Sequence, residues 1–300
     1  MESKPQLQAI KSPYLVSDSF RVSRSPTRPP ANVDDKEALK SQLAASVAAL
    51  DTLQRQLYAD GRHAVLLVFQ AMDAAGKDST IRAVLSGVDP AGCQVTSFKR
   101  PSALELDHDF LWRTTQALPQ RGRIGVFNRS YYEEVLAVRV HPEFLEAQRL
   151  PQRPRSLERL WAQRYESIRD HERHLAHNGT VILKFWLHVS AEEQRQRLLA
   201  RLDEPDKQWK FESADLDVRA RWADYMKAYQ AALRETSRPW APWYAIPADN
   251  KPYMRATIAD LIVRRLSAID LRYPELAPAE RARIGEFRRR LARPQSRSGK

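Results

Sequence analysis

Apolar residues along this chain occur in two alternating arrangements, short continuous runs and longer segments with helical spacing. The first helical segment follows Asp34 or Asp35, either of which can cap it, and its apolar residues recur every three or four positions until Gly61. Short apolar runs then predict strands at residues 64–69, 94–98, 124–127, 181–189 and 243–247. The segments between them predict helices at about 77–87, 103–117, 131–138, 156–177, 191–202, 215–235 and 252–269.

This alternation is typical of an α/β fold in which a mostly parallel five-stranded sheet lies between two layers of helices, a three-layer αβα arrangement. It leaves no second core, and we therefore expect a single domain over residues 36–270. Residues 1–35 are rich in Pro, Ser and Arg without sustained periodicity, which predicts an extended arm that lies on the body or on a neighbouring subunit. Residues 271–300 are expected to form a basic tail.

The formal net charge of +12 is concentrated towards the end of the sequence. Residues 281–300 carry eight Lys or Arg and one Glu, which leaves about +5 for the other 280 residues. A mildly basic body suits an anionic substrate, while the basic tail is expected to be solvated. The charge also raises nucleic-acid binding as an alternative. The chain has no zinc-binding pattern or RNP-like motif, and such a role would leave the loop described below unexplained, so we expect no nucleic-acid partner.

The hydropathy pattern does not predict a membrane partner. The longest apolar run, residues 181–189, is interrupted by Lys184 and His188 and is shorter than the roughly 20 residues that span a bilayer. The N-terminus, MESKPQLQAIKSPY, has no apolar stretch after its first charges and does not resemble a secretory signal. Cys93 is the only cysteine and cannot form an internal disulfide, which fits a reducing compartment. We therefore expect a cytoplasmic protein.

The segment LLVFQAMDAAGKDSTIRAVL passes from a predicted buried strand through a turn of small residues into a helix, which is the setting of a phosphate-binding (Walker A) loop. The pattern GxxxxGK[ST] is met strictly only at Gly76 and Lys77. Small residues let backbone N–H groups approach a phosphate, and they stand here at Ala71, Ala74, Ala75 and Gly76. Lys77 is then expected to place its charge on the phosphate oxygens.

The metal-binding hydroxyl of that pattern is missing, because Asp78 occupies its position. Asp73, Asp78 and Ser79 are the alternative candidates to hold a metal ion. A second polar set, Asn128, Arg129 and Ser130, ends the strand predicted at 124–127, where phosphate-loop enzymes ordinarily carry a metal-binding Asp. The carboxyl ends of parallel strands are where α/β sheets place chemistry. The alternative is that Asn128 and Ser130 only cap the next helix.

Taken together, the two motifs and their surroundings resemble the polyphosphate kinase 2 family, whose members are P-loop kinases with a thymidylate-kinase-like fold and a helical lid. The resemblance covers about residues 65–255 and rests on QAMDAAGKDSTIRAVLSGV, SFKRPSALELDHDFLWR, IGVFNRSYYEEVLAVRVHPEFL, VILKFWLHVSAEEQRQRLLARLDEPDKQWKFESADLDVRARWADY and TSRPWAPWYAIPADNK. The wording FNRSYYEEV and RVH is most similar to the class III subgroup, which phosphorylates both AMP and ADP.

The resemblance implies roles for five catalytic candidates. It implies that Asp73 binds Mg²⁺ or orients the attacking nucleotide phosphate, and that Lys77 stabilises the transferred phosphoryl group. Asn128 and Arg129 stand where the family commonly has Asp-Arg, so the Asn is a departure and the Arg is implied to contact phosphate. Glu133 matches the acidic position linked to nucleotide handling in class III and is the candidate for accepting AMP as well as ADP.

Further binding residues are implied around these. The loop candidates are Ala74, Ala75, Gly76, Asp78 and Ser79, and those outside the loop are Lys99 and Arg113. Arg113 has a surface position as its alternative, and residues 247–250 either border a nucleotide or are structural. The lid is expected at residues 197–210, and its charges would close over the phosphates from Arg201, Lys207 and Lys210.

The implied reaction is reversible in-line phosphoryl transfer from inorganic polyphosphate to AMP, ADP or both, giving ADP and ATP. Mg²⁺ is the implied cofactor, with Mn²⁺ as a substitute. Adenine nucleotides are the implied acceptors, with guanine nucleotides as further candidates, and the assembly is expected to be a homo-oligomer, a dimer or a tetramer. The rival enzyme is a nucleoside monophosphate kinase that uses ATP. It shares the loop and lid but requires a base pocket on its donor side.

Overall fold

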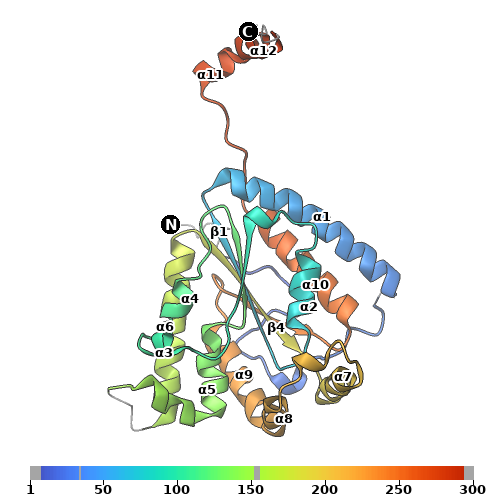
Figure 1. Cartoon of the computed structure of the whole chain (residues 1–300), viewed down its shortest axis with the longest axis vertical. Helices are drawn as coiled ribbons and strands as arrows, with labels where there is room; N and C mark the ends of the chain where they lie inside the picture. The colour runs from blue at the N-terminus through green and yellow to red at the C-terminus, as the bar shows by residue number, and fades with distance from the viewer. Residues whose placement is uncertain (1–7, 34, 152–155, 294–300) are drawn as a thin grey trace, which may run out of the picture.

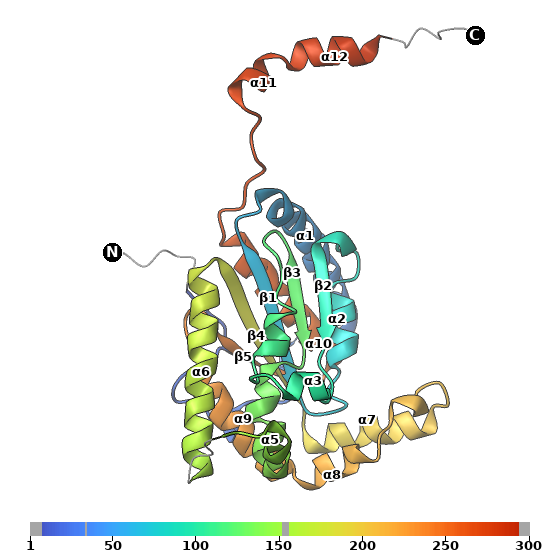
Figure 2. The ribbon, with the colours of Figure 1, turned by 60° about the vertical axis from the view of Figure 1, so that its left-hand side comes forward.

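The structure is a computed structural model that describes residues 8–33, 35–151 and 156–293. In these ranges one parallel sheet has the strand order β2-β3-β1-β4-β5. The strands are β1 (Ala64–Ala71), β2 (Cys93–Ser97), β3 (Ile124–Asn128), β4 (Thr180–His188) and β5 (Trp243–Pro247). Helices cover both faces of this sheet, as Figures 1 and 2 show. The predicted strands and the three-layer arrangement are confirmed.

The helices divide into two layers and a group at one end of the sheet. One face carries α1 (Lys36–Asp60), α2 (Lys77–Val84) and α10 (Lys251–Ser267). The other carries α5 (Ala137–Val140), α6 (Leu157–His177) and α9 (Trp222–Thr236). At the carboxyl ends of the strands lie α7 (Ala191–Asp203) and α8 (Ala214–Ala220). All residues of β1 and β3 are buried, as expected for strands covered on both faces.

Helix α1 begins and ends where the sequence predicts. The Asp35 carboxylate accepts hydrogen bonds from the backbone N–H groups of Glu37 and Ala38. Gly61 ends the helix with φ of 64°, a left-handed conformation that glycine adopts without steric cost. Asp34, the other predicted cap, lies outside the described residues.

Three predicted helices, 103–117, 131–138 and 215–235, are not continuous helices in the structure. The stretch predicted as one helix at 103–117 contains two single turns, α3 (Ala103–Leu106) and α4 (Trp112–Thr115), because Asp109 accepts a hydrogen bond from the Leu111 N–H and starts a new turn. The helix predicted at 215–235 is broken into α8 and α9 at Arg221, whose guanidinium donates to the carbonyl of Val140. The first break coincides with a local polar contact, and the second with a contact between distant segments of the chain.

The remaining irregular elements are short 3-10 turns. They are η2 (Val22–Arg24), η3 (Pro90–Gly92), η4 (Tyr131–Val135), η5 (Pro142–Gln148) and η6 (Gln208–Lys210). The helix predicted at 131–138 is therefore a 3-10 turn, η4, followed by the short helix α5.

The described part of the arm, residues 8–33, lies against the open edge of the sheet. The Val16 N–H donates to the Trp243 carbonyl at 2.9 Å, and the Ala245 N–H donates to the Tyr14 carbonyl at 2.8 Å. The arm thereby pairs antiparallel with β5 over a few residues and covers backbone groups that an edge strand would otherwise expose.

Beyond α10 an extended segment leads to α11 (Pro278–Ala282) and α12 (Ile284–Ala292), which project away from the sheet in Figures 1 and 2. Side chains there are largely exposed, Leu291 to 87%. Among the described helices, none has the length and apolar character that crossing a bilayer requires.

Candidate active site

The predicted phosphate loop joins β1 to α2 at the carboxyl edge of the sheet. Two of its residues have left-handed backbone conformations, Ala74 with φ of 60° and Gly76 with φ of 103°. Gly76 directly precedes the first residue of α2, so the loop ends at a helix N-terminus. This is the strand, turn and helix geometry that turns backbone N–H groups towards a bound phosphate.

Lys77 is buried and points back over this loop. Its ammonium donates to the carbonyl of Ala71 at 2.9 Å and to that of Met72 at 3.4 Å. Burial lowers its pKa, the nearby Arg129 lowers it further, and the carboxylates of Asp73 and other residues oppose the shift. Lys77 therefore lies within a cluster of charges from both predicted motifs.

Arg129 brings the second motif to the loop. Its guanidinium donates to the Asp73 carboxylate at 2.6 Å, and its backbone N–H donates to the carbonyl of Phe69 in β1. Nearby Glu133 is the main cause of a raised pKa for Arg129. Asp73, Lys77, Arg129 and Glu133 thus form one cluster, which we call the loop cluster.

Asn128 contacts the start of α2. Its amide group donates to the Asp78 carboxylate at 2.5 Å and lies 3.4 Å from the hydroxyl of Ser97. Beside these residues is a hollow of about 450 Å³, with walls from α2, β2 and the end of β3. Ser79 donates instead to the carbonyl of Gly76 at 3.1 Å.

The predicted metal candidates provide oxygen ligands of the type that Mg²⁺ prefers. Proteins often bind Mg²⁺ through one or two carboxylates together with substrate phosphates and water. Asp73 in the loop and Asp78 on the first turn of α2 provide two such carboxylates beside the phosphate loop. Within the described residues no group of three His, Cys, Asp or Glu side chains forms a metal site without substrate. The residues present therefore fit a metal ion that binds together with phosphate.

Helix α7 donates hydrogen bonds to the phosphate loop from Gln194 and Arg197. The sequence analysis predicted neither contact. Gln194 donates to the Asp73 carbonyl at 3.0 Å. Arg197, expected only as the first residue of the lid, donates to the Ala75 carbonyl at 2.8 Å and to the Ala248 carbonyl at 2.7 Å. Arg197 therefore ties the phosphate loop to the turn between β5 and α10. Their i, i+3 spacing on one helix face was the available signal, but it does not reveal which carbonyls they meet.

Two of the predicted lid charges, Arg201 and Lys207, contact nearby carboxylates, one in α8 and one on the lid itself. Arg201 lies 3.6 Å from the Asp215 carboxylate, and Lys207 pairs with Glu204. The side chain of Lys210 lies outside the described residues. A role for these three in closing over phosphates stays a prediction.

The side chain of Arg113 contacts the backbone of Lys99. Arg113 is buried, donates to the Lys99 carbonyl at 2.8 Å and lies over the ring of Phe98. This geometry supports the segment after β2, while the Lys99 side chain is exposed. Phosphate contacts by either residue stay a prediction.

The two neighbouring glutamates of η4 have different surroundings. Glu134 is buried and its carboxylate lies 3.1 Å from the guanidinium of Arg164, which is also buried. Glu133 is partly exposed and belongs to the loop cluster. Together with burial, its charge raises the pKa of Tyr225 and Tyr229 in α9. These tyrosines were missed by the sequence analysis because they come from a distant segment.

A second hollow, which we call the basic groove, lies between residues of α1, α7 and the start of α10. It is a hollow of about 340 Å³ whose charged walls are the cations of Lys36, Arg197 and Lys251 and the carboxylates of Glu193 and Asp249. Burial lowers the pKa of Lys251, and so do the neighbouring cations Arg197 and Arg255. The carboxylate of Glu193, 2.7 Å from the Arg197 guanidinium, offsets part of the repulsion between these cations, and a bound anion would offset it further.

Three comparisons place these features among known proteins. A match to the family described as polyphosphate kinase 2 (PPK2) covers residues 33–274. The ADP-polyphosphate phosphotransferase of Rhodopseudomonas palustris is 54% identical over 270 residues, 90% of this chain and 93% of that protein. The AMP/ADP-polyphosphate phosphotransferase of Meiothermus ruber is 48% identical over 240 residues, 80% and 85%. The crystal structure of polyphosphate kinase 2 from Arthrobacter aurescens is similar with a TM-score of 0.83 and 38% identity, covering 93% of this chain and 99% of that one.

Proposed function

The chain belongs to the polyphosphate kinase 2 family, and from this we propose that it transfers a phosphoryl group from inorganic polyphosphate to both AMP and ADP. It is a phosphotransferase, a polyphosphate-dependent nucleotide kinase. The predicted family and the P-loop kinase fold are confirmed. The residues that carry the reaction, the metal and the acceptor range are the proposed part.

The loop cluster is the observation that supports the proposed roles. It places Lys77 and the Arg129–Asp73 pair next to a loop with left-handed backbone conformations at Ala74 and Gly76. The acceptor phosphate is already ionised near neutral pH, so the transfer needs no strong general base. Lys77 and Arg129 stabilise negative charge on the transferred group, and the loop holds the donor in line with the acceptor. Asp73 and Asp78 would hold Mg²⁺, which when bound supplies further charge stabilisation to the phosphate oxygens.

The basic groove supports polyphosphate as the donor. A linear polyphosphate carries about one negative charge per phosphate and has no base to recognise, so it needs positive charge along its path. Lys36, Arg197 and Lys251 provide positive charge for such a path beside the phosphate loop, where their excess over the carboxylates of Glu193 and Asp249 is one charge. An ATP donor would in addition require a pocket for its base.

The position of Glu133 supports the proposal that both AMP and ADP are acceptors. Its charge acts on Tyr225 and Tyr229 of α9, a helix on the opposite face of the sheet from α1 and α10, which carry Lys36 and Lys251 of the basic groove. A carboxylate can accept hydrogen bonds from a nucleobase amine or from metal-bound water, whereas it repels bare phosphate. The two relatives described above are named for ADP alone and for AMP and ADP, so the acceptor range requires measurement.

The test is an assay of the purified protein with polyphosphate and either AMP or ADP, without ATP. We expect ADP to form from AMP and ATP to form from ADP, and chelation of divalent cations to stop both reactions until Mg²⁺ or Mn²⁺ is restored. A second arm supplies ATP and AMP without polyphosphate. Turnover only in this second arm would make the protein a nucleoside monophosphate kinase and refute the proposal. We further propose a cytoplasmic homo-oligomer, for which light scattering after size-exclusion chromatography gives the mass.

A further inference from the structure

A buried ion pair lies in the middle of the molecule, outside the loop cluster. Lys184 of β4 and Glu172 of α6 are both fully buried, and the Lys184 ammonium donates to the Glu172 carboxylate at 2.6 Å. The same ammonium donates to the Tyr132 hydroxyl oxygen at 2.8 Å and to the Thr236 carbonyl at 2.9 Å. An ammonium has three donors, so every one of them is used.

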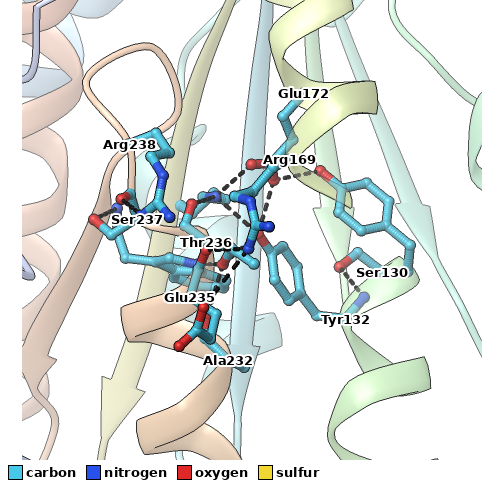
Figure 3. A network of polar contacts seen from close by, with 12 residues as sticks. Ser130, Tyr132, Arg169, Glu172, Ala232, Glu235, Thr236, Ser237 and Arg238 are labelled. Carbon is cyan, nitrogen blue, oxygen red and sulfur yellow. Dashed lines mark hydrogen bonds and ion pairs between the residues drawn. The ribbon is translucent and has the colours of Figure 1, made fainter. Parts of the chain in front are cut away.

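The Glu172 carboxylate extends these contacts to η4. One of its oxygens accepts hydrogen bonds from the hydroxyls of Tyr131 and Tyr132, each at 2.9 Å. Figure 3 shows Tyr132, Glu172 and Thr236 converging from three different elements. Burial and the neighbouring carboxylate raise the pKa of both tyrosines well above the usual range, so both remain O–H donors at neutral pH.

Such an ion pair is a weak source of stability. Removing two charges from water costs about as much free energy as their attraction returns, and apolar replacements of buried pairs are often neutral or stabilising. Here desolvation lowers the pKa of Lys184 to about 8. The pair instead fixes the orientation of the Tyr131 and Tyr132 side chains, because hydrogen bonds to their hydroxyls are directional and apolar contacts are not.

These two tyrosines follow the turn that carries Arg129. Arg129 has φ of 63°, a conformation that is uncommon for a residue with a side chain and that persists only where its surroundings enforce it. On one side of the turn the backbone is fixed by the hydrogen bond from Arg129 to Phe69 of β1. On the other side, oxygens of Ser130 accept hydrogen bonds from the backbone N–H groups of Tyr132 and Glu133. The two tyrosine hydroxyls then connect this short turn to Glu172 and Lys184 in the interior. Glu133 comes directly after the two tyrosines in η4.

We propose that Lys184 and Glu172 are positioning residues for phosphoryl transfer, which through Tyr131 and Tyr132 hold Arg129 and Glu133 in place at the phosphate loop. This inference rests on the proposed function of the loop cluster. The ion pair itself touches no substrate. Its effect on the reaction passes through the strained turn, so loosening the tyrosines disorders the Arg129 guanidinium relative to Asp73.

The test uses Tyr132→Phe, which removes one hydroxyl and keeps the ring. Tyr165→Phe is the matched control, because Tyr165 is also buried on this face of the sheet and its hydroxyl accepts a hydrogen bond from Arg139 at 2.6 Å. We expect Tyr132→Phe to lower kcat about tenfold or more at saturating polyphosphate, with a smaller change in the KM for polyphosphate. Tyr165→Phe should leave kcat within about twofold of the wild type, whatever its effect on the unfolding midpoint in urea.

A double-mutant cycle with Arg129→Ala distinguishes a role of Tyr132 in positioning Arg129 from a role in stabilising the fold as a whole. In an Arg129→Ala background, Tyr132→Phe should lower kcat by less than about twofold, because the group that it positions is already absent. Equal losses in both backgrounds, or a normal kcat for Tyr132→Phe, would overturn the inference. If Tyr132→Phe does not fold, the same cycle is run with Tyr131→Phe, which leaves all three Lys184 contacts intact. Failure of the wild type to use polyphosphate would instead refute the proposed function.

Discussion

The guanidinium of Arg129 and the carboxylate of Asp73 lie 2.6 Å apart, across the carboxyl ends of the adjacent strands β3 and β1. The pair joins two sequence motifs that are 56 positions apart. Lys77 lies in the same charge cluster and reaches back over the loop that contains Asp73. The arrangement concentrates positive charge where a phosphoryl group would be transferred, and it leads to the first prediction.

Lys77→Ala is expected to lower polyphosphate-dependent turnover about 100-fold or more, a loss of about 3 kcal/mol of transition-state stabilisation. Asp73→Asn should have an effect of the same order, because it weakens both the Arg129 pair and a metal ligand. Lys40→Ala is the control, since Lys40 is an exposed lysine of α1 that pairs only with Glu37 in the described contacts. Steady-state rates with AMP and ADP measure the effect. Near-normal turnover of both site variants would remove the loop cluster from the mechanism.

Arg197 is predicted to matter more than its helix neighbour Arg195. Arg197→Gln removes hydrogen bonds to the carbonyls of Ala75 and Ala248 and loosens the loop, so kcat/KM for polyphosphate should fall about tenfold or more. Arg195 lies on the same helix, is exposed and pairs with Glu192. Arg195→Gln should therefore change kcat/KM by less than about twofold. Equal effects of the two substitutions would argue against a role for Arg197 in fixing the loop.

The sequence predicted the sheet well because a parallel strand covered on both faces is a continuous apolar run. All five strands lie within two residues of their predicted ends. The helix predicted at 103–117 failed because Asp109 restarts the chain through a local hydrogen bond, a contact that apolar spacing does not reveal. Lys184 and His188 interrupted the apolar run at 181–189, yet both are buried. Their hydrogen-bond partners come from distant segments, so their burial could not be predicted from the run itself.

The candidate site was only partly predictable for the same reason. Asp73, Lys77 and Arg129 belong to local motifs whose strand and loop setting predicts where the strands end. Tyr225 and the cations of the basic groove reach the site through tertiary packing, and no local pattern in the sequence indicates which side chains of their elements do so. The sequence does not distinguish two roles for Arg113, since an arginine that donates to a backbone carbonyl has the same sequence signature as one that binds phosphate.

His188 provides a prediction for the pH dependence of stability. Burial lowers its pKa from 6.5 to about 4, so the folded state disfavours its protonated form. Above pH 6.5 the residue is neutral in both folded and unfolded states. Between pH 6.5 and 4 the unfolded chain binds the proton more readily, and stability falls as the pH falls, by up to about 3 kcal/mol in total.

The measurement is the free energy of unfolding in urea at several pH values. His188→Gln should flatten the decline between pH 6.5 and 4, while His177→Gln, a change at an exposed histidine, should leave it unchanged. An identical slope for wild type and His188→Gln would assign the acid sensitivity to other groups.

Deletion of residues 281–300 is expected to leave the domain folded and turnover on short polyphosphate within about twofold of the full chain, because surface changes away from a site have small effects. The helix α12 in this segment projects away from the sheet, and its Leu291 side chain is 87% exposed. Circular dichroism and the same kinetic assay test both parts. Loss of activity in a truncated protein that remains folded would place the tail in the catalytic site.

The acceptor preference provides the sharpest test of the site, because it tests a single carboxylate of the loop cluster, Glu133. Glu133→Gln should alter the ratio of AMP to ADP turnover several-fold, about 1 kcal/mol of discrimination between the two acceptors. The physical reason is that Glu133 carries its charge next to Arg129, so neutralising it changes how strongly this side of the cluster attracts the acceptor phosphates.

Glu134 at first suggests itself as the control for this experiment, but the structure excludes it. Its carboxylate is buried against Arg164 at 3.1 Å and also accepts a hydrogen bond from Gln148, so Glu134→Gln would leave a buried charge without its partner and destabilise the fold. Glu146 is exposed and close in sequence, and Glu146→Gln is the better control. The ratio is measured with Mg²⁺ and polyphosphate saturating, so that only the acceptor step differs. An unchanged ratio in Glu133→Gln would limit this residue to favouring the N-terminus of η4 and would leave the acceptor range to other side chains, with Tyr225 and Tyr229 as the next candidates.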